Sequence, residues 1–194
     1  MKQIKSIPWE EVKEQWKQSE DNELWRDFYQ KKGFKTWEDW RWPRIKMLKL
    51  AERDWNLEES ENTIEEVRAM FCDATTRWTD FYTRRSDSTF KNLKDHPFFV
   101  NHKRVQSIRE NFPNKSQLIG LRHKDQIIVV DGHHRATAIA GMPDSNHIEI
   151  QMALSEISDN EFDKLYFGGK LLKLERNIWS TIALIRSQMK NTLD

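Results

Sequence analysis

Residues 126–140 read QIIVVDGHHRATAIA, and this stretch decides the fold. Its first part contains the aliphatic run Ile127–Val130, which is typical of a strand buried on both faces. Its last part, Ala136–Ala140, has the composition of a helix and is followed by glycine and proline, which stop helices. Between them lie five polar or flexible residues, Asp131–Arg135. The stretch therefore predicts a buried strand that leads through a tight turn into a helix.

The turn between this strand and this helix has the residue types of an anion-binding site. Gly132 permits a tight turn and lets a ligand approach the backbone closely. The first N–H groups of the following helix have no partner within the helix, and the helix dipole is positive at that end. His133 and His134 add donors there, and the Arg135 guanidinium can hold two anionic oxygens at once. Asp131 can cap the helix, orient a histidine, hold Mg²⁺ or accept a proton.

Simpler interpretations of the same residues explain only part of the pattern. Asp-Gly is by itself a turn signal, and two adjacent histidines are a weak motif. Neighbouring side chains on a helix point about 100° apart, so His133 and His134 are not expected to share a zinc ion. A structural turn would not need five polar or flexible residues between a buried strand and an alanine-rich helix. We therefore expect an anion- or nucleotide-binding turn.

The segments around the turn predict a small mixed core. Residues 102–111 suit a short helix, and Arg104 at its start is a further candidate for the anion site, although a solvated helix face is the alternative. Leu118–Leu121 is a second short strand, and residues 147–152 alternate apolar and polar side chains as a half-buried strand does. The expected fold class is α+β.

The string DGHHR, preceded by IIVV and followed by ATAIA, resembles the ParB/sulfiredoxin superfamily, and in motif it is nearest to the ParB-like free serine kinases. The resemblance covers residues 90–155. It implies a small α+β core in which Gly132, His133, His134 and Arg135 contact the phosphates of a nucleotide. Asp131 matches the acidic residue that precedes this turn in the family.

The resemblance also implies an enzyme, with Asp131 and His133 as catalytic candidates and Asp131 as a possible Mg²⁺ ligand. The serine kinases take a catalytic acid from an early strand, for which Asp95 and His96 are the nearest candidates here.

Two branches of the family fit poorly. Sulfiredoxins carry a reactive cysteine where this chain has histidine, and partition proteins carry a DNA-reading domain after the core, where this chain has only about 40 residues of zero net charge.

The regions outside the resemblance are predicted to be helical, which gives three ranges: a tryptophan-rich region 1–89, the core 90–155 and C-terminal helices 156–194. In the first, Asp21 is expected to cap a helix that Gly33 ends, Thr36 is expected to start another, and Pro43 to break it or open the next. The aromatics of this region are expected to pack a small core. Four of them carry that expectation: Trp37, Trp40, Trp42 and Trp55.

Two further helices are predicted from capping patterns and spacing. Thr63 and Glu66 form a capping-box pattern ahead of an apolar stripe, which predicts a helix over residues 64–84. Ser158 and Glu161 form the same pattern ahead of a second helix. A last helix over residues 171–189 carries a stripe that we expect to cover the core, with an interface between copies as the alternative. That stripe consists of Leu174, Ile178, Ile182, Ile185 and Met189.

Composition narrows the classes of protein that the chain can be. Of its 194 residues 37% are hydrophobic and 32% charged, and the formal net charge is +1. No apolar run approaches the ~20 residues of a membrane span, and a single cysteine, Cys72, excludes an internal disulfide. We therefore expect a cytoplasmic protein without a membrane partner. The most basic segment, residues 91–155, has nine basic and six acidic residues, which disfavours nucleic acid as a partner.

The leading functional hypothesis is a nucleotide-binding enzyme that transfers a phosphoryl group to a small molecule or hydrolyses the nucleotide. Its expected ligands are ATP, ADP or CTP with Mg²⁺, together with a small-molecule substrate. The first alternative is a non-catalytic nucleotide- or DNA-binding module that uses its tryptophan-rich helices as a partner surface. A weaker alternative is a metal-dependent nuclease.

Overall fold

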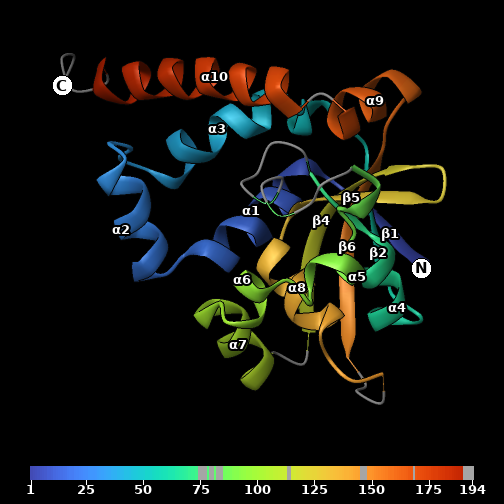
Figure 1. Cartoon of the computed structure of the whole chain (residues 1–194). Coiled ribbons are helices and arrows are strands. Elements are labelled where there is room, and N and C mark those ends of the chain that lie inside the picture. The colour runs from blue at the N-terminus through green and yellow to red at the C-terminus, as the bar shows by residue number, and fades with distance from the viewer. Residues whose placement is uncertain are drawn as a thin grey trace. The chain divides into compact units, whose positions relative to one another are not determined.

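The computed structural model shows an α+β protein (Figure 1) and describes residues 1–73, 78, 81, 85–112, 115–144, 148–167 and 169–189. The chain forms two compact units. Unit 1 consists of Met1–Ile7 and Asp54–Gly169, and unit 2 consists of Pro8–Arg53 and Lys170–Asp194. The units thus divide the chain differently from the three consecutive ranges expected from the sequence, because each unit combines segments that are far apart along the chain.

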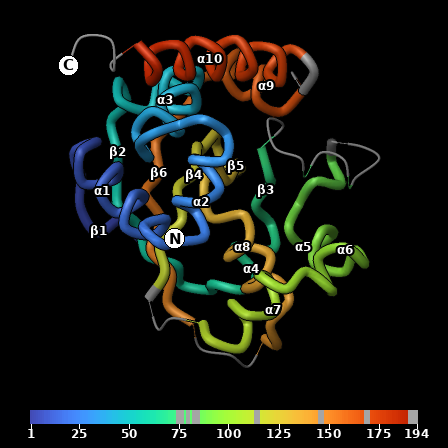
Figure 2. The backbone as a smooth tube through the Cα atoms, turned by 90° about the vertical axis from the view of Figure 1, so that its left-hand side faces the viewer, coloured from blue at the N-terminus to red at the C-terminus, as the bar shows by residue number. Residues whose placement is uncertain are grey.

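A six-stranded mixed sheet forms the centre of unit 1, in the order β1-β2-β6-β4-β5-β3 (Figure 2). Its strands are β1 (Lys2–Ile7), β2 (Trp55–Glu59), β3 (Phe71–Cys72), β4 (Lys115–His123), β5 (Gln126–Asp131) and β6 (Glu149–Glu156). β5 lies between β4, which is antiparallel to it, and β3, which is parallel to it. Since parallel strands end at the same edge of a sheet, the residues that follow β3 and β5 lie next to one another.

The strands and the helix predicted around the decisive stretch are confirmed. Ile128, Val129 and Val130 of β5 are buried, as expected of an interior strand. The helix that follows is α8 (His133–Ala140), and Gly141 ends it. The other helices of unit 1 are short: α4 (Thr63–Ala69), α5 (Phe90–Leu93), α6 (Pro97–Val100), α7 (Lys103–Glu110) and α9 (Asp159–Phe167).

The helix predicted over residues 64–84 is wrong beyond its first turns. α4 ends at Ala69, because Met70 takes an extended backbone conformation (φ −70°, ψ 154°) and the chain enters β3. Phe71 and Cys72 then pair with Ile128 and Val129 of β5. In this pairing Cys72 is completely buried and Phe71 is partly buried. The rest of the predicted helix lies largely outside the described residues, with Trp78, Phe81 and the short turn Arg85–Asp87 as exceptions.

Unit 2 is helical. Its elements are α1 (Trp9–Glu20), α2 (Glu23–Lys31), α3 (Trp37–Met47), the short 3₁₀ helix η1 (Leu50–Glu52) and α10 (Gly169–Met189). The expected aromatic core is present in part: the Trp16 and Trp37 rings meet edge to face at 5.5 Å, and both are buried. Trp40 packs against aromatic side chains of α2. Trp55 does not belong to this core, because it lies on β2 of unit 1.

Two expectations about the helices of unit 2 are corrected. Asn22 rather than Asp21 caps α2: its side chain accepts a hydrogen bond from the backbone N–H of Trp25. Thr36 caps α3 as predicted, but Pro43 lies inside that helix and neither ends it nor opens another. Pro43 is buried, which offsets the loss of one backbone hydrogen bond.

The apolar stripe of α10 faces solvent, and the prediction that it covers the core is wrong. Leu174 is 58% exposed and Ile178 is 54% exposed. The buried face of α10 carries Leu172, Ala183 and Ser187 instead. These three residues include only one large aliphatic side chain, so α10 packs with a narrow face and leaves most of its long aliphatic side chains outward.

Candidate functional site

The turn after β5 depends on glycine. Gly132 has φ +92°, a backbone conformation that strains any residue with a side chain. A Cβ at this position would also lie 2.3 Å from Cδ2 of the buried Leu118. Because Gly132 is the N-cap of α8 and has no side chain, it offers no side-chain acceptor to the first N–H groups of the helix.

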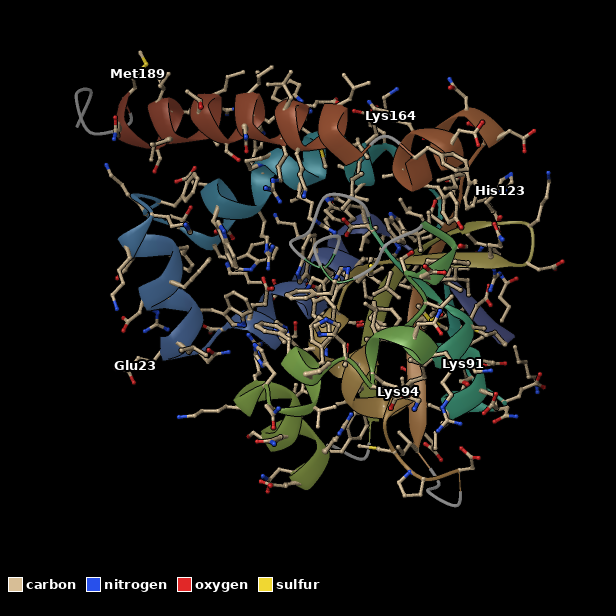
Figure 3. All side chains as sticks on the ribbon, in the orientation of Figure 1. Glu23, Lys91, Lys94, His123, Lys164 and Met189 are labelled. Carbon is tan, nitrogen blue, oxygen red and sulfur yellow. The ribbon has the colours of Figure 1, made fainter. Side chains whose placement is uncertain are left out.

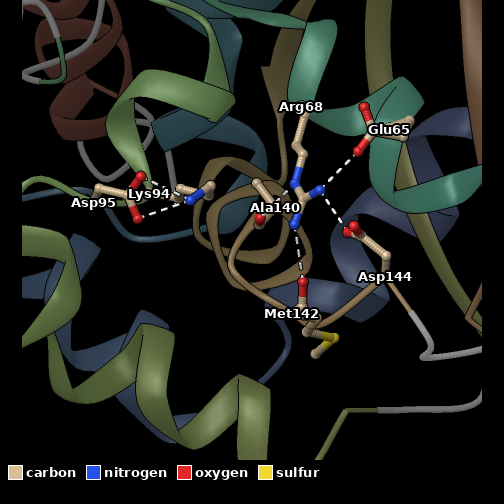
Figure 4. Close-up of polar contacts among 7 residues, drawn as sticks. All are labelled: Glu65, Arg68, Lys94, Asp95, Ala140, Met142 and Asp144. Atoms are coloured by element: carbon tan, nitrogen blue, oxygen red, sulfur yellow. Dashed lines mark hydrogen bonds and ion pairs between the residues drawn. The ribbon is translucent and has the colours of Figure 1, made fainter.

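Arginine side chains bind the C-terminal end of α8, and Figure 4 shows the contacts of one of them, Arg68. At the C-terminal end, Arg68 donates from Nε to the carbonyl of Ala140 and from an Nη to that of Met142, both at 3.0 Å. Arg109 donates to the carbonyl of Ala138 at 3.4 Å. Two arginines thus complement the negative end of this helix dipole. The positive end of α8 lies at the polar turn, where an anion would have the corresponding role.

Asp131 and Arg135 interact with each other across the turn. Nη2 of Arg135 lies 3.0 Å from Oδ2 of Asp131, and both side chains are largely buried. The sequence predicts that Arg135 contacts the ligand, and it is compatible with several roles for Asp131. The structure shows that the carboxylate holds the guanidinium in place and neutralises part of its charge. The guanidinium has five N–H donors, so one hydrogen bond to Asp131 does not exhaust it.

His133 lies between a carboxylate and aromatic rings. Its Nε2 is 3.4 Å from Oδ2 of Asp73, close enough for electrostatic attraction but without the alignment of a hydrogen bond. Asp73 is completely buried, and the ring of His133 packs against Trp78 and Phe90. Within the described part of the chain, Nε2 of His133 is a buried polar atom with no hydrogen-bond partner. Such atoms are costly unless a ligand or water satisfies them.

His134 lies beside further cationic or polar groups. Burial, together with the neighbouring Arg104, His102 and His133, lowers the pKa of His134 from 6.5 to about 3, while Asp131 acts in the opposite direction. The ring is therefore neutral at pH 7 and contributes an N–H donor rather than a positive charge. The prediction that Arg104 belongs to this neighbourhood gains support, since its charge acts on His134.

Two residues at this edge were missed by sequence reasoning. Asp73 follows β3 directly, and the wrongly predicted helix over 64–84 hid its place next to the end of β5. His102 precedes α7, and its ring centre lies 5.0 Å from that of His134. Nδ1 of His102 is also buried without a hydrogen-bond partner among the described residues. The sequence pattern that could have indicated Asp73 is the apolar pair Phe71–Cys72 directly before it, which is compatible with a short strand. No pattern in the sequence indicates His102.

Asp95, the predicted candidate for a catalytic acid, lies on the surface. Both of its carboxylate oxygens accept hydrogen bonds from Nζ of Lys94, at 2.8 and 2.7 Å, and its side chain is 74% exposed (Figure 4). Its neighbour His96 caps α6 by accepting from the N–H of Phe98. Both residues thus have local structural roles in the contacts that the structure shows.

The site suits a cation only as part of a larger ligand. Among the described residues no group of three or more histidine, cysteine, aspartate or glutamate side chains is arranged to hold a metal ion. Asp131 and Asp73 lie at the ends of adjacent strands, and Mg²⁺ commonly needs only one or two carboxylates when phosphate oxygens complete its shell. Asp131 and Asp73 are therefore the residues that could contribute carboxylate oxygens if Mg²⁺ were bound together with phosphate.

Comparisons of this chain with known proteins found no matching family model, no matching curated protein and no matching solved structure. In the described part of the chain, no helix is both long enough and apolar enough to cross a membrane.

Proposed function

We propose that unit 1 binds the phosphates of a nucleotide at the turn between β5 and α8, and that it transfers a phosphoryl group to a small molecule or hydrolyses the nucleotide. This is the function that the resemblance to ParB/sulfiredoxin proteins, nearest to the free serine kinases, also implies. The proposed enzyme acts in the cytoplasm on ATP, ADP or CTP with Mg²⁺. One observation carries the proposal: a glycine-dependent helix N-terminus lies beside buried imidazole nitrogens that have no hydrogen-bond partner among the described residues.

Some groups at the turn bind the phosphate oxygens in this proposal, and others hold the binding side chains in position. Phosphoryl transfer depends chiefly on placing the reactants and neutralising charge. In the proposal the α8 N–H groups, Arg104 and Arg135 hold the phosphate oxygens, and the ring nitrogen of His133 donates to one of them. Mg²⁺ supplies further neutralisation when it is bound with the nucleotide. Asp131 keeps the Arg135 guanidinium oriented toward the turn.

Asp73 is the residue that we propose as the source of acid–base chemistry, in place of Asp95. It is completely buried, it lies 3.4 Å from His133, and it ends the strand next to β5. Because Nε2 of His133 faces the Asp73 carboxylate, these two groups can share one proton, and in the proposal the pair exchanges that proton with a substrate hydroxyl or water. A nuclease or a DNA-binding module gains no specific support from these contacts.

Calorimetric titration with Mg²⁺ and ATP, ADP or CTP tests the proposal. Arg135→Ala is expected to weaken nucleotide binding by about 2–4 kcal/mol, because it removes a guanidinium that is held in a largely buried position. Arg109→Ala is the matched control, since this arginine contacts the opposite end of α8 and is expected to leave the affinity unchanged. Equal affinities of Arg135→Ala and the wild type would contradict the proposed site.

The enzymatic part of the proposal has its own test. Phosphate release or transfer is measured with small hydroxylated acceptors and with water alone. Asp73→Asn is expected to abolish turnover while nucleotide binding persists, because the substitution preserves shape and removes the proton acceptor. Binding without turnover in the wild-type protein, over the whole panel, would favour the non-catalytic module.

A further inference from the structure

We propose that α10 is a dimerisation helix, which pairs antiparallel with α10 of a second copy of this chain. The observation is the outward apolar face of this helix, which we call the α10 stripe. Its members are Leu171, Leu174, Ile178, Ile182, Ile185 and Met189, and all six are exposed. Figure 3 shows the last of them, Met189, projecting from the helix.

The α10 stripe is straight and continuous. Leu171 and Met189 are 18 residues apart, which is five turns of a helix with 3.6 residues per turn. Its members therefore stay on one side of α10 over its length of about 31 Å. Solvent-exposed aliphatic residues are ordinary when they are scattered, but an unbroken row along five turns marks an interaction surface.

The sequence of the α10 stripe is nearly symmetric about Ser180. Leu171 and Met189 are each nine residues from this position, and Ile178 and Ile182 are each two residues from it. When one copy of the helix is turned end over end against another, large aliphatic side chains therefore meet aliphatic side chains along the whole contact. A surface that complements itself under a twofold rotation is the requirement for a symmetric dimer. A foreign partner would not require this symmetry.

The charges beside the α10 stripe agree with the same pairing. Glu175 lies five residues before Ser180 and Arg186 lies six residues after it. At about 100° per residue, both lie on the same flank of the stripe. In an antiparallel twofold pair, like flanks face each other, so Glu175 lies opposite the partner's Arg186, and the same pair is repeated by symmetry. The Arg186 guanidinium lies 4.6 Å from the ring centre of Trp42, which holds it beside the stripe.

Size and composition also favour a second copy. Two such stripes bring together on the order of 1,000 Å² of accessible surface, which is the lower limit for a specific protein interface. Helices that lie on membranes carry rows of lysine and arginine beside their apolar face. Here one flank carries the Glu175 and Arg186 pair, and the other carries Lys170 together with the uncharged Asn177, Thr181 and Gln188, so neither flank has a row of basic residues.

The oligomeric state of the full-length protein tests this inference. Sedimentation and light scattering between about 1 and about 200 µM are expected to show a monomer that becomes a dimer as the concentration rises, in the range of a small interface. Ile178→Lys is expected to keep the protein monomeric throughout. Leu24→Lys is the matched control, because Leu24 is exposed to a similar degree on α2 of the same unit and lies outside the stripe. It is expected to leave the dimer intact.

Charge reversal tests the antiparallel arrangement itself. Glu175→Arg and Arg186→Glu are each expected to weaken the dimer about tenfold or more, because each places like charges opposite one another. The double variant is expected to restore it, since the pair is then merely inverted. A monomer at every concentration would overturn the inference, as would a dimer that Ile178→Lys leaves unchanged. A dimer in which the double variant is no better than the single ones would overturn the antiparallel pairing.

Discussion

At the scale of single residues, the turn after β5 combines one glycine with side chains from two distant parts of the chain: Gly132 has φ +92°, and Asp73 lies 3.4 Å from His133. Gly132 was predictable because a short strand and a helix met at one glycine, a local pattern. Asp73 was not, since its position depends on a parallel pairing between β3 and β5 that spans more than fifty residues. The interaction of Arg135 with Asp131 was not predictable either: the two are four residues apart, but Asp131 ends β5 and only Arg135 lies on α8, so the spacing rule for ion pairs within a helix does not apply.

The pKa of His134 predicts how stability changes with pH. The value is about 3 in the folded protein and about 6.5 in the unfolded chain. Between these values the unfolded chain binds a proton that the folded protein does not, so stability falls as the pH falls from 6.5 toward 3. The slope is up to about 1.4 kcal/mol per pH unit. Above pH 6.5 this group makes no contribution to the slope.

His134→Gln is expected to remove this part of the acid dependence, because glutamine does not titrate. The measurement is the free energy of unfolding in urea at several values between pH 7 and pH 4.5, for the wild type and the variant. As the pH falls, the free energy of unfolding should decrease less for the variant than for the wild type. Parallel curves would show that the His134 imidazole takes up its proton over the same pH range in the folded protein as in the unfolded chain.

At the scale of elements, capping patterns predicted some helix starts and failed at others. Ser158 and Glu161 form the predicted capping box: the backbone N–H of Ser158 donates to the Glu161 carboxylate at 3.1 Å, and the Ser158 hydroxyl accepts from the N–H of Glu161. The same pattern at Thr63 and Glu66 does not act as a cap. Glu66 accepts instead from the chain's N-terminus at 2.8 Å. The Glu66 side chain, which the capping-box pattern predicts to cap the helix, therefore makes a long-range contact instead.

The start of α2 gives a direct test of local capping. Asn22→Ala is expected to destabilise the protein by about 1 kcal/mol, because it removes the acceptor for the N–H of Trp25. Asp21→Ala is the matched control: its carboxylate is exposed and pairs with Arg26 at the surface, so the change should be much smaller. Urea unfolding of both variants decides between them, and a larger loss for Asp21→Ala would mean that the cap is the residue predicted from sequence.

At the scale of the whole molecule, the chain forms two units whose boundaries no sequence pattern predicted. The polar hexapeptide of β1 is largely exposed at a sheet edge, so it lacks the alternation by which strands are recognised. Its pairing with β2 over residues 55–59 places the first residues of the chain in unit 1, while residues 8–53 belong to unit 2. Fold class followed from local patterns; the division into units depended on contacts between distant segments.

The two units can be followed separately in unfolding experiments, because their probes differ. Seven of the nine tryptophans lie in unit 2, whereas the sheet lies in unit 1. Trp16→Ala removes a buried ring and should lower the stability reported by tryptophan fluorescence by about 3–5 kcal/mol. Hydrogen exchange of the amides in β4–β6 should change less. Phe90→Ala removes a buried ring of unit 1, so it should change hydrogen exchange in β4–β6 more than the stability reported by tryptophan fluorescence. Equal effects of a substitution on both probes would show that the two units unfold as a single cooperative unit.

The division of the chain also sets an order of events during protein synthesis. The segments of unit 1 have all been made once residue 169 has been added, but unit 2 requires α10, which is made afterwards. Residues 8–53, with six of the tryptophans, therefore leave the ribosome long before the last helix of their own unit exists. During that interval their aromatic side chains lack part of their packing, and the nascent chain is at its most vulnerable to aggregation.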